Sequence, residues 1–119
     1  TLYSSREFAD ANPDTVARLT RSVYGAQQWL HSRSPNEIAE RIGPYFPDVA
    51  HDIAARAIER YRANGVWGVD PVLPVEGFVR LKSALLSGGF INRDIPFERC
   101  VDNRFALAAV AGDPPGGQG

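Results

Sequence analysis

The feature that most constrains the fold is a run of apolar residues spaced alternately three and four positions apart. The run consists of Val16, Leu19, Val23, Ala26 and Leu30. This spacing places all of them on one face of an α-helix, which repeats about every 3.6 residues. Asn12-Pro13 predicts where that helix starts, because proline is tolerated at the first helical position and keeps the preceding residue out of the α region. We therefore expect one long helix over residues 13–33.

Capping signals divide the rest of the chain. Ser34 with Glu37 three positions later is typical of a capping box and predicts a short helix that ends at Gly43. Asp48 is expected to cap a third substantial helix, and Gly65 follows the end of that helix as a left-handed stop. The full set of expected helices covers residues 5–11, 13–33, 34–42, 48–64, 74–87 and 96–109, with a break in the last near 102–103.

These patterns predict a chain that is mostly α-helical, with about five or six helices and at most one short strand near the N-terminus, at residues 2–4. Residues 1–110 are expected to form the helical portion. Residues 111–119 are rich in glycine and proline and are expected to be a flexible tail. Because the sequence contains no methionine and begins at Thr1, we also expect it to be part of a longer translated product.

Composition excludes several classes of function. The 13 basic and 14 acidic residues give a net charge of −1, which argues against a nucleic-acid partner held by bulk charge. No apolar run approaches the roughly 18 residues that a membrane span needs. A single cysteine, Cys100, excludes an internal disulfide and a cysteine-based metal cluster. Because Cys100 lies among apolar residues of the last helix, we expect a buried, inert thiol.

The polar residues give little indication of catalysis. His31 and His51 lie twenty positions apart without a metal-ligand spacing, so no metal site and no cofactor are expected. Four acidic residues precede an arginine by four positions and are expected to form exposed helical ion pairs: Asp14/Arg18, Glu37/Arg41, Asp52/Arg56 and Glu76/Arg80. Without a nucleophile, a base or a metal cluster, the residues favour a protein that is not an enzyme.

A few residues have both a structural and a functional interpretation. Ser4 and Ser5 precede the first helix and are weak candidates for contact with an anionic ligand, with simple N-capping as the alternative. Trp29 and Trp67 could stack on a ligand, but their apolar surroundings favour a role as packing anchors. Asp102-Asn103-Arg104 is expected to form a hydrogen-bonded joint between two short helices.

The order of short runs along the chain carries a further inference. The runs are Ser5–Ala9, Asn12–Val16, Trp29-Leu30, Ser34–Ala39, Ala57–Tyr61, Gly65–Trp67, Pro74–Phe78, Gly89–Ile91, Pro96-Phe97 and Val101–Ala106. This ordered set resembles the C-terminal part of the periplasmic substrate-binding proteins of ABC importers for nitrate, sulfonate, taurine and thiamine-precursor pyrimidines, which belong to the type II periplasmic binding protein superfamily. It covers nearly everything from Leu2 to Ala109.

The resemblance implies a longer parent with a two-lobed α/β fold, of which this chain is the helical closing portion. The parent would capture a small solute outside the cytoplasmic membrane by lobe closure and deliver it to an ABC permease. Most solute contacts would come from upstream residues. Apolar surface left by the missing part would favour self-association of this portion alone.

Two alternatives stay open. The chain could be a stand-alone helical domain whose apolar stripes dock a partner protein. An enzymatic branch, the pyrimidine synthases, also resembles the superfamily, but its cysteine-rich iron motif does not occur in these residues.

Overall fold

The computed structural model describes residues 2–112. Over this range it contains seven α-helices and one 3₁₀ turn and no β-strand, so the expectation of a mostly α-helical chain is confirmed. The elements are α1 (Arg6–Ala11), α2 (Pro13–Ser32), α3 (Pro35–Ile42), η1 (Gly43–Tyr45), α4 (His51–Ala63), α5 (Val75–Ser87), α6 (Phe97–Cys100) and α7 (Arg104–Ala111). In the tail expected over 111–119, Ala111 ends α7 and Gly112 is its C-cap. The other seven residues of that tail lie outside the described range.

The short strand expected at residues 2–4 is not present. These residues lead into α1 without regular structure, and no other described segment is extended beside them as a strand partner. A strand needs such a partner for its backbone hydrogen bonds.

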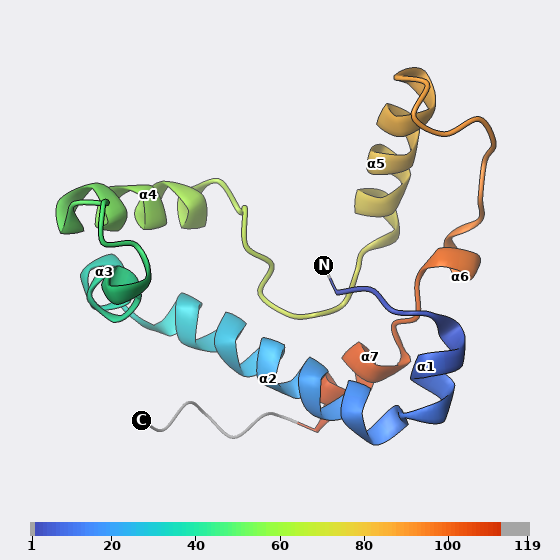
Figure 1. Cartoon of the computed structure of the whole chain (residues 1–119), viewed down its shortest axis with the longest axis horizontal. Helices are drawn as coiled ribbons and strands as arrows, with labels where there is room; N and C mark the ends of the chain where they lie inside the picture. Colours follow the sequence, from blue (N-terminus) through green and yellow to red (C-terminus); the bar gives the residue numbers. More distant parts are fainter. Residues whose placement is uncertain (1, 113–119) are drawn as a thin grey trace.

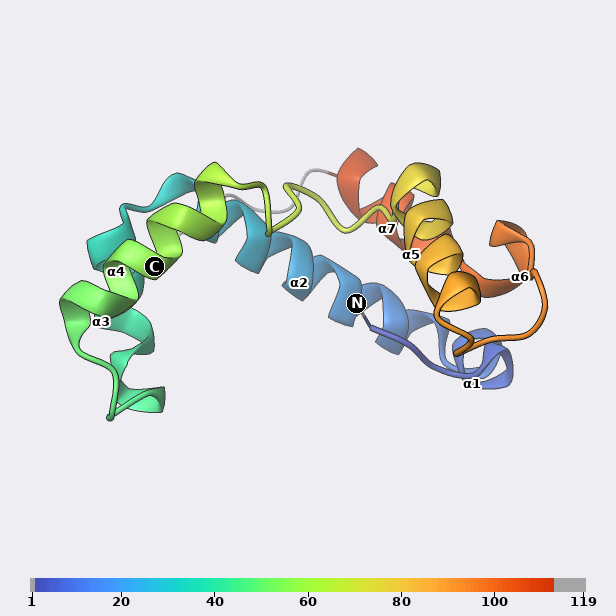
Figure 2. The same cartoon turned by 90° about the horizontal axis from the view of Figure 1, so that it is seen from above.

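The helices form an elongated molecule around α2 (Figures 1 and 2). α3 and α4 lie at the C-terminal end of α2, whereas α1 and α7 pack near its N-terminal half. The radius of gyration is 16.9 Å, and the molecule measures 44 × 36 × 23 Å. A compact domain of this length would have a radius of gyration of about 13.5 Å. The chain is therefore considerably more open than an ordinary globular domain. None of the helices in residues 2–112 is both long and apolar enough to cross a membrane.

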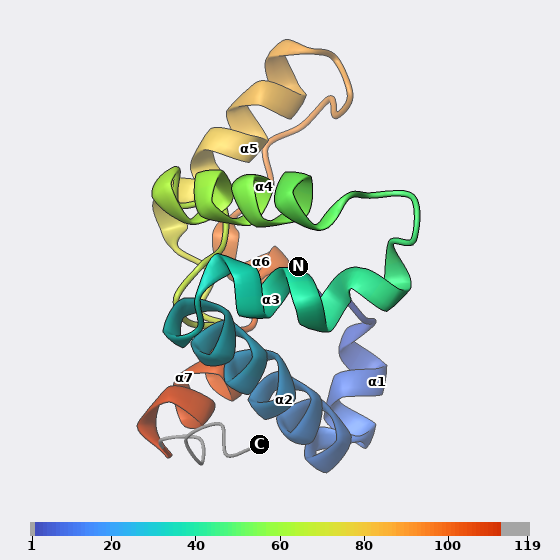
Figure 3. The same ribbon diagram turned by 90° about the vertical axis from the view of Figure 1, so that its left-hand side faces the viewer.

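α3 and α4 lie next to each other at the end of α2 (Figure 3). One apolar cluster holds them together. Its buried members are Ile38, Ala39, Ala55 and Ile58. Trp29 and Trp67 pack against this cluster, and the Trp67 ring meets the Tyr61 ring edge-on at a centroid distance of 5.5 Å. The interpretation of both tryptophans as packing anchors is confirmed.

The capping box at the start of α3 forms as expected. The Ser34 amide donates to Glu37 Oε2 at 2.8 Å, and the Glu37 amide donates to Ser34 Oγ at 3.2 Å. The backbone hydrogen bond from Ser34 lowers the pKa of the Glu37 carboxyl, and the Ser34 side chain and Arg33 lower it further.

The start of α4 differs from the expectation. α4 begins at His51 with Ala50 as N-cap, and no side chain caps it, so the assignment of Asp48 as the cap was wrong. The Val49 amide donates to the Phe46 carbonyl, so residues 46–49 form a turn in which the chain reverses direction after η1. Asp48 lies within this turn and not at the start of the helix. The left-handed stop expected after α4 is confirmed by the positive φ angle of Gly65 (62°), and Gly89 (φ 72°) ends the turn after α5 in the same conformation.

A second contact joins α2 to α7. Tyr24 of α2 is buried, as are Ala106 and Ala109 of α7, whose small side chains allow the two helices to approach closely. Arg104 then links α7 to α1, because its guanidinium donates to Asp10 Oδ1 at 2.5 Å and to Asp102 Oδ2 at 2.8 Å. Both hydrogen bonds raise the pKa of Arg104, and the bond to Asp10 has the larger effect.

The linker between α4 and α5 is held along α2 by polar contacts. Gln27 Nε2 donates to the Asp70 carbonyl at 2.9 Å, and His31 Nε2 lies 3.3 Å from the Gly68 carbonyl oxygen. At its far end the Asn103 side chain accepts from the Leu73 amide at 3.0 Å and donates to the Leu73 carbonyl at 2.9 Å. Between α6 and α7 the Arg104 amide donates to Asp102 Oδ1 at 3.1 Å, so the expected hydrogen-bonded joint between these two short helices is confirmed. Asn103, in contrast, joins the start of α7 to residues before α5. We call residues 66–73 the strap.

The expected surface ion pairs form only in part. Asp52 and Arg56 pair at 3.4 Å, whereas the other three expected pairs are not within ion-pair distance. Glu37 is used instead by the capping box and by Arg33, 3.9 Å away. Exposed pairs contribute little, so backbone hydrogen bonds decide where such a carboxylate lies.

We predict that Asn103→Ala lowers the free energy of unfolding by about 1–3 kcal/mol, because both backbone groups of Leu73 lose their partner. Urea denaturation of the chain measures this loss. Asn92→Ala is the control, since Asn92 is exposed in a loop and should change stability by less than about 0.5 kcal/mol. Equal effects of the two substitutions would contradict the role given to Asn103.

We also predict that Glu37 makes stability depend on pH. Its pKa is lowered from the ordinary 4.5 in the folded chain, so its contribution is present above pH 4.5 and is lost as the pH falls through the lower folded value. The difference in unfolding free energy between the unchanged chain and Glu37→Gln should therefore shrink below pH 4.5. Denaturation over a pH series tests this, with exposed Glu59→Gln as control. A difference that stays constant down to acid pH would show that the capping-box charge does not matter.

Candidate interaction surface

The side chains of the two serines that are ligand candidates form hydrogen bonds with backbone groups one to three residues away. Ser5 Oγ accepts from the Phe8 amide at 3.1 Å, so the N-capping interpretation is confirmed for Ser5. Ser4 Oγ donates to the Ser5 carbonyl at 3.2 Å, and both residues are exposed. No element other than α1 contributes polar groups to them. Contact of Ser4 and Ser5 with a ligand stays a prediction that their geometry does not strengthen.

Both histidine side chains lie against backbone carbonyl oxygens. His51 Nε2 lies 3.3 Å from the Asn36 carbonyl oxygen, which joins the start of α4 to α3, and His31 contacts the strap. Within residues 2–112 no group of three or more histidine, cysteine or acidic side chains could hold a metal ion.

The expectation of a buried Cys100 was wrong. The thiol is exposed, although its neighbours in the sequence are apolar. The reason is that α6 is a single helical turn that packs on α5 through Phe97, whose ring lies 5.4 Å from that of Phe78. The opposite side of so short a helix has nothing to cover it.

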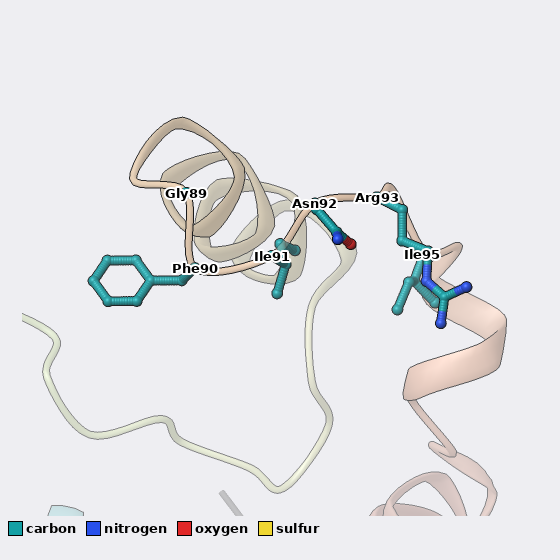
Figure 4. Close-up of a pocket in the computed structure, with 6 residues that line it drawn as sticks. All are labelled: Gly89, Phe90, Ile91, Asn92, Arg93 and Ile95. Carbon is teal, nitrogen blue, oxygen red and sulfur yellow. The ribbon is translucent and has the colours of Figure 1, made fainter.

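A shallow hollow lies in the loop after α5 (Figure 4). Its lining residues all come from this one loop and are Gly89, Phe90, Ile91, Asn92, Arg93 and Ile95. The Phe90 side chain is 80% exposed and points away from Arg93 and Ile95. Binding sites for small molecules usually enclose most of the ligand surface, which one open loop does not do. This hollow is therefore a poor candidate for a solute site.

Apolar side chains left on the surface are the more informative feature. On α2 the apolar stripe expected from the sequence is only partly covered: Leu19 is 49% exposed, whereas Tyr24, on a different face, is only 8% exposed. The covered face of α2 is the one that also carries Gln27 and His31, the residues that bind the strap. Leu30, on the same apolar stripe as Leu19, packs against the α3–α4 cluster, so the stripe is covered at the C-terminal end of α2 and exposed at Leu19.

α4 has one apolar side that is buried and another that is exposed. Ala55 and Ile58 face α3 and are buried. A line of apolar residues at four-residue spacing begins just before α4 and runs along its flank, and we call it the α4 ridge: Val49, Ile53, Ala57 and Tyr61. Val49, Ile53 and Tyr61 are exposed.

Further large apolar side chains are exposed on α5 and in the loops. They include Tyr45, Phe46, Val75, Val79, Leu81 and Phe90. Exposed apolar side chains that lie together on one helix flank, as on α4, are candidates for contact with another macromolecule. The sequence pattern located the apolar stripe of α2. It did not indicate the isolated aromatics Tyr45 and Phe90, which follow no periodicity.

Comparison with known proteins yields a distant relative. No model of a protein family matches the chain, and no solved structure matches it. A stretch of 106 residues is 27% identical to a Bacillus subtilis (strain 168) protein named "Putative binding protein YtlA". The match covers 89% of this chain and 32% of that protein. The chain thus spans about a third of the length of the curated relative it matches.

We predict that the Cys100 thiol reacts with a maleimide reagent in the folded chain at a rate within about threefold of that in denaturant, because it is exposed and free. Labelling followed by mass spectrometry with and without urea measures the two rates. Labelling that is very slow until urea is added would show that the thiol is covered, as the sequence pattern alone had indicated.

Proposed function

We propose that this chain is the C-terminal part of the solute-binding component of an ABC importer. The parent protein would capture a small solute, such as nitrate, taurine or another alkanesulfonate, or a pyrimidine, outside the cytoplasmic membrane and deliver it to the permease. The observation that carries the proposal is the match over 106 residues to a protein named as a binding protein. The ordered runs that resemble this family support it and cover almost the same part of the chain.

The distribution of apolar surface agrees with a chain that works as part of something larger. α2, α4 and α5 each leave apolar side chains exposed, and the molecule is more extended than an independent domain of its length. In the relative, about two thirds of the polypeptide has no counterpart in this chain. We propose that a corresponding upstream part covers these surfaces.

The described residues fit a supporting role better than direct solute contact. The polar side chains Gln27, His31 and Asn103 hold the strap, and Ser5 caps α1. Lobe closure needs contacts that favour the closed state, and these come from residues on both sides of a cleft. We therefore assign the solute contacts of the proposed parent chiefly to residues outside this chain.

A second candidate, a stand-alone helical interaction domain, is favoured by the same exposed apolar side chains. The two candidates differ in what they bind. A solute-binding component is stabilised by a small molecule, whereas an interaction domain is stabilised by a protein.

The test is a thermal unfolding experiment on the longer protein that contains these residues. Nitrate, taurine, an alkanesulfonate and a hydroxymethylpyrimidine are added separately, with chloride and glycine as controls at the same ionic strength. We expect one of the first group to raise the Tm. A ligand at about 100 times its Kd adds about 2.7 kcal/mol to the free energy of unfolding.

Isothermal titration calorimetry then confirms that the stabilising solute binds with a stoichiometry of one. A protein that none of the four solutes stabilises, but that binds another polypeptide through these helices, would overturn the proposal in favour of the interaction domain.

A further inference from the structure

The C-terminal end of α4 carries a chemically reactive pair of residues, Asn64-Gly65. Asn64 is the only asparagine of the chain that is followed by glycine. Because glycine has no side chain to shield its backbone nitrogen, this nitrogen can attack the side-chain amide of the asparagine before it. Asn64 and Gly65 are both exposed, so water also reaches the pair. The two residues therefore have the chemistry and the exposure of a deamidation site.

The end of the helix itself favours the glycine. The Gly65 amide donates to the Arg62 carbonyl at 3.1 Å, and the Val66 amide donates to the Tyr61 carbonyl at 2.9 Å. Together these two hydrogen bonds form a Schellman motif, which needs a residue with positive φ at the position of Gly65. A Cβ at Gly65 would meet no atom within 4 Å, so the backbone conformation, and not a lack of space, favours glycine there.

The same motif keeps the two reacting groups apart. Asn64 has φ −90° and ψ 3°. At this ψ the Gly65 nitrogen lies on the side of the Asn64 amide nitrogen and is turned away from the Asn64 side chain. Ring closure needs a rotation of ψ that breaks the hydrogen bond from Gly65 to Arg62, and it also needs the proton that this bond holds. The last turn of α4 must therefore open before the reaction can occur.

We propose that Asn64 is a site of spontaneous deamidation, and that the intact end of α4 confines this modification to molecules in which the end has opened. In the opened end, the Gly65 nitrogen loses its proton and forms a bond to Asn64 Cγ. The bond from Cγ to Nδ2 breaks, and ammonia leaves with the proton. Water then opens the resulting five-membered succinimide at either carbonyl carbon and gives aspartate or isoaspartate. Water is the only co-reactant, and no atom changes its oxidation state.

The modified end of α4 closes less readily than the original one. Isoaspartate carries the backbone through its side chain, which lengthens the connection between α4 and the strap by one carbon atom. Both products also place a negative charge at the C-terminal end of a helix, where the helix dipole disfavours it. The change falls next to Trp67, the residue of the strap that packs against the α3–α4 cluster. This inference does not depend on the proposed function.

The experiment compares deamidation of the longer protein in its folded state and in urea, at the same pH and temperature. Trypsin releases residues 63–80, in which Asn64 is the only asparagine, and mass spectrometry measures the mass gain from amide to acid. We expect the folded protein to react at least about tenfold more slowly, because only the opened fraction reacts. A smaller difference would overturn the proposal, and so would the absence of reaction in urea.

Asn92 is an internal control in the same digest. It is exposed in the loop after α5 but is followed by an arginine, and trypsin releases it in residues 83–93. Lys82 holds that loop, because its ammonium pairs with Asp94 at 2.6 Å and donates to the Ile95 carbonyl at 3.3 Å. We expect slow reaction of Asn92 in both conditions. A rate in urea equal to that of the Asn-Gly pair would overturn the assignment of the site.

Two variants test whether the end of α4 is what suppresses the reaction. Trp67→Ala removes the ring that meets Tyr61 edge-on at this end, so Asn64 should react at least about threefold faster in the folded variant. Phe90→Ala removes a ring that is 80% exposed and should leave the rate unchanged. Circular dichroism checks that both variants are folded. Equal rates in the two folded variants would overturn the proposal, and if Trp67→Ala does not fold, the comparison in the unchanged protein decides.

Discussion

The pair of hydrogen bonds between the Asn103 side chain and the Leu73 backbone determines how the two ends of the molecule are related. Asn103 directly precedes α7, which packs on α2, and Leu73 closely precedes α5. The segment between these two positions, residues 74–102, therefore leaves the body of the chain and returns to it at one point. Because α5 makes few other contacts, its placement depends on this junction and on the small contact with α6.

Polar contacts hold the strap in place and an apolar cluster holds α3 and α4 together, whereas several large apolar side chains stay exposed. The strap lies on the face of α2 that carries Gln27 and His31, and the larger apolar residues of that helix, such as Leu19, are turned partly to water. Hydrogen bonds fix geometry but contribute modest net free energy, whereas apolar burial supplies most of the driving force for folding. The chain therefore combines a specific arrangement with a small apolar core.

Local signals in the sequence were sufficient for most of the helix boundaries. Ser34 with Glu37, and Gly65, act through contacts within a few residues, so their roles could be predicted. The start of α4 at His51 and the exposure of Cys100 could not be predicted, because the first depends on how the chain reverses after η1 and the second on how little of α6 is covered. The candidate surface was predictable as apolar stripes. Which part of each stripe stays exposed depends on neighbours far away in the sequence.

The environment of Lys82 has a practical consequence for chemistry performed on this protein. Reagents that couple to lysine side chains meet a single target in the chain, and that amine holds Asp94 and the Ile95 carbonyl. Acylation would remove the positive charge and release the loop that shapes the hollow in Figure 4. Amine cross-linking would therefore report almost nothing about the arrangement of these helices, and where it reacted it would alter the segment it was meant to map.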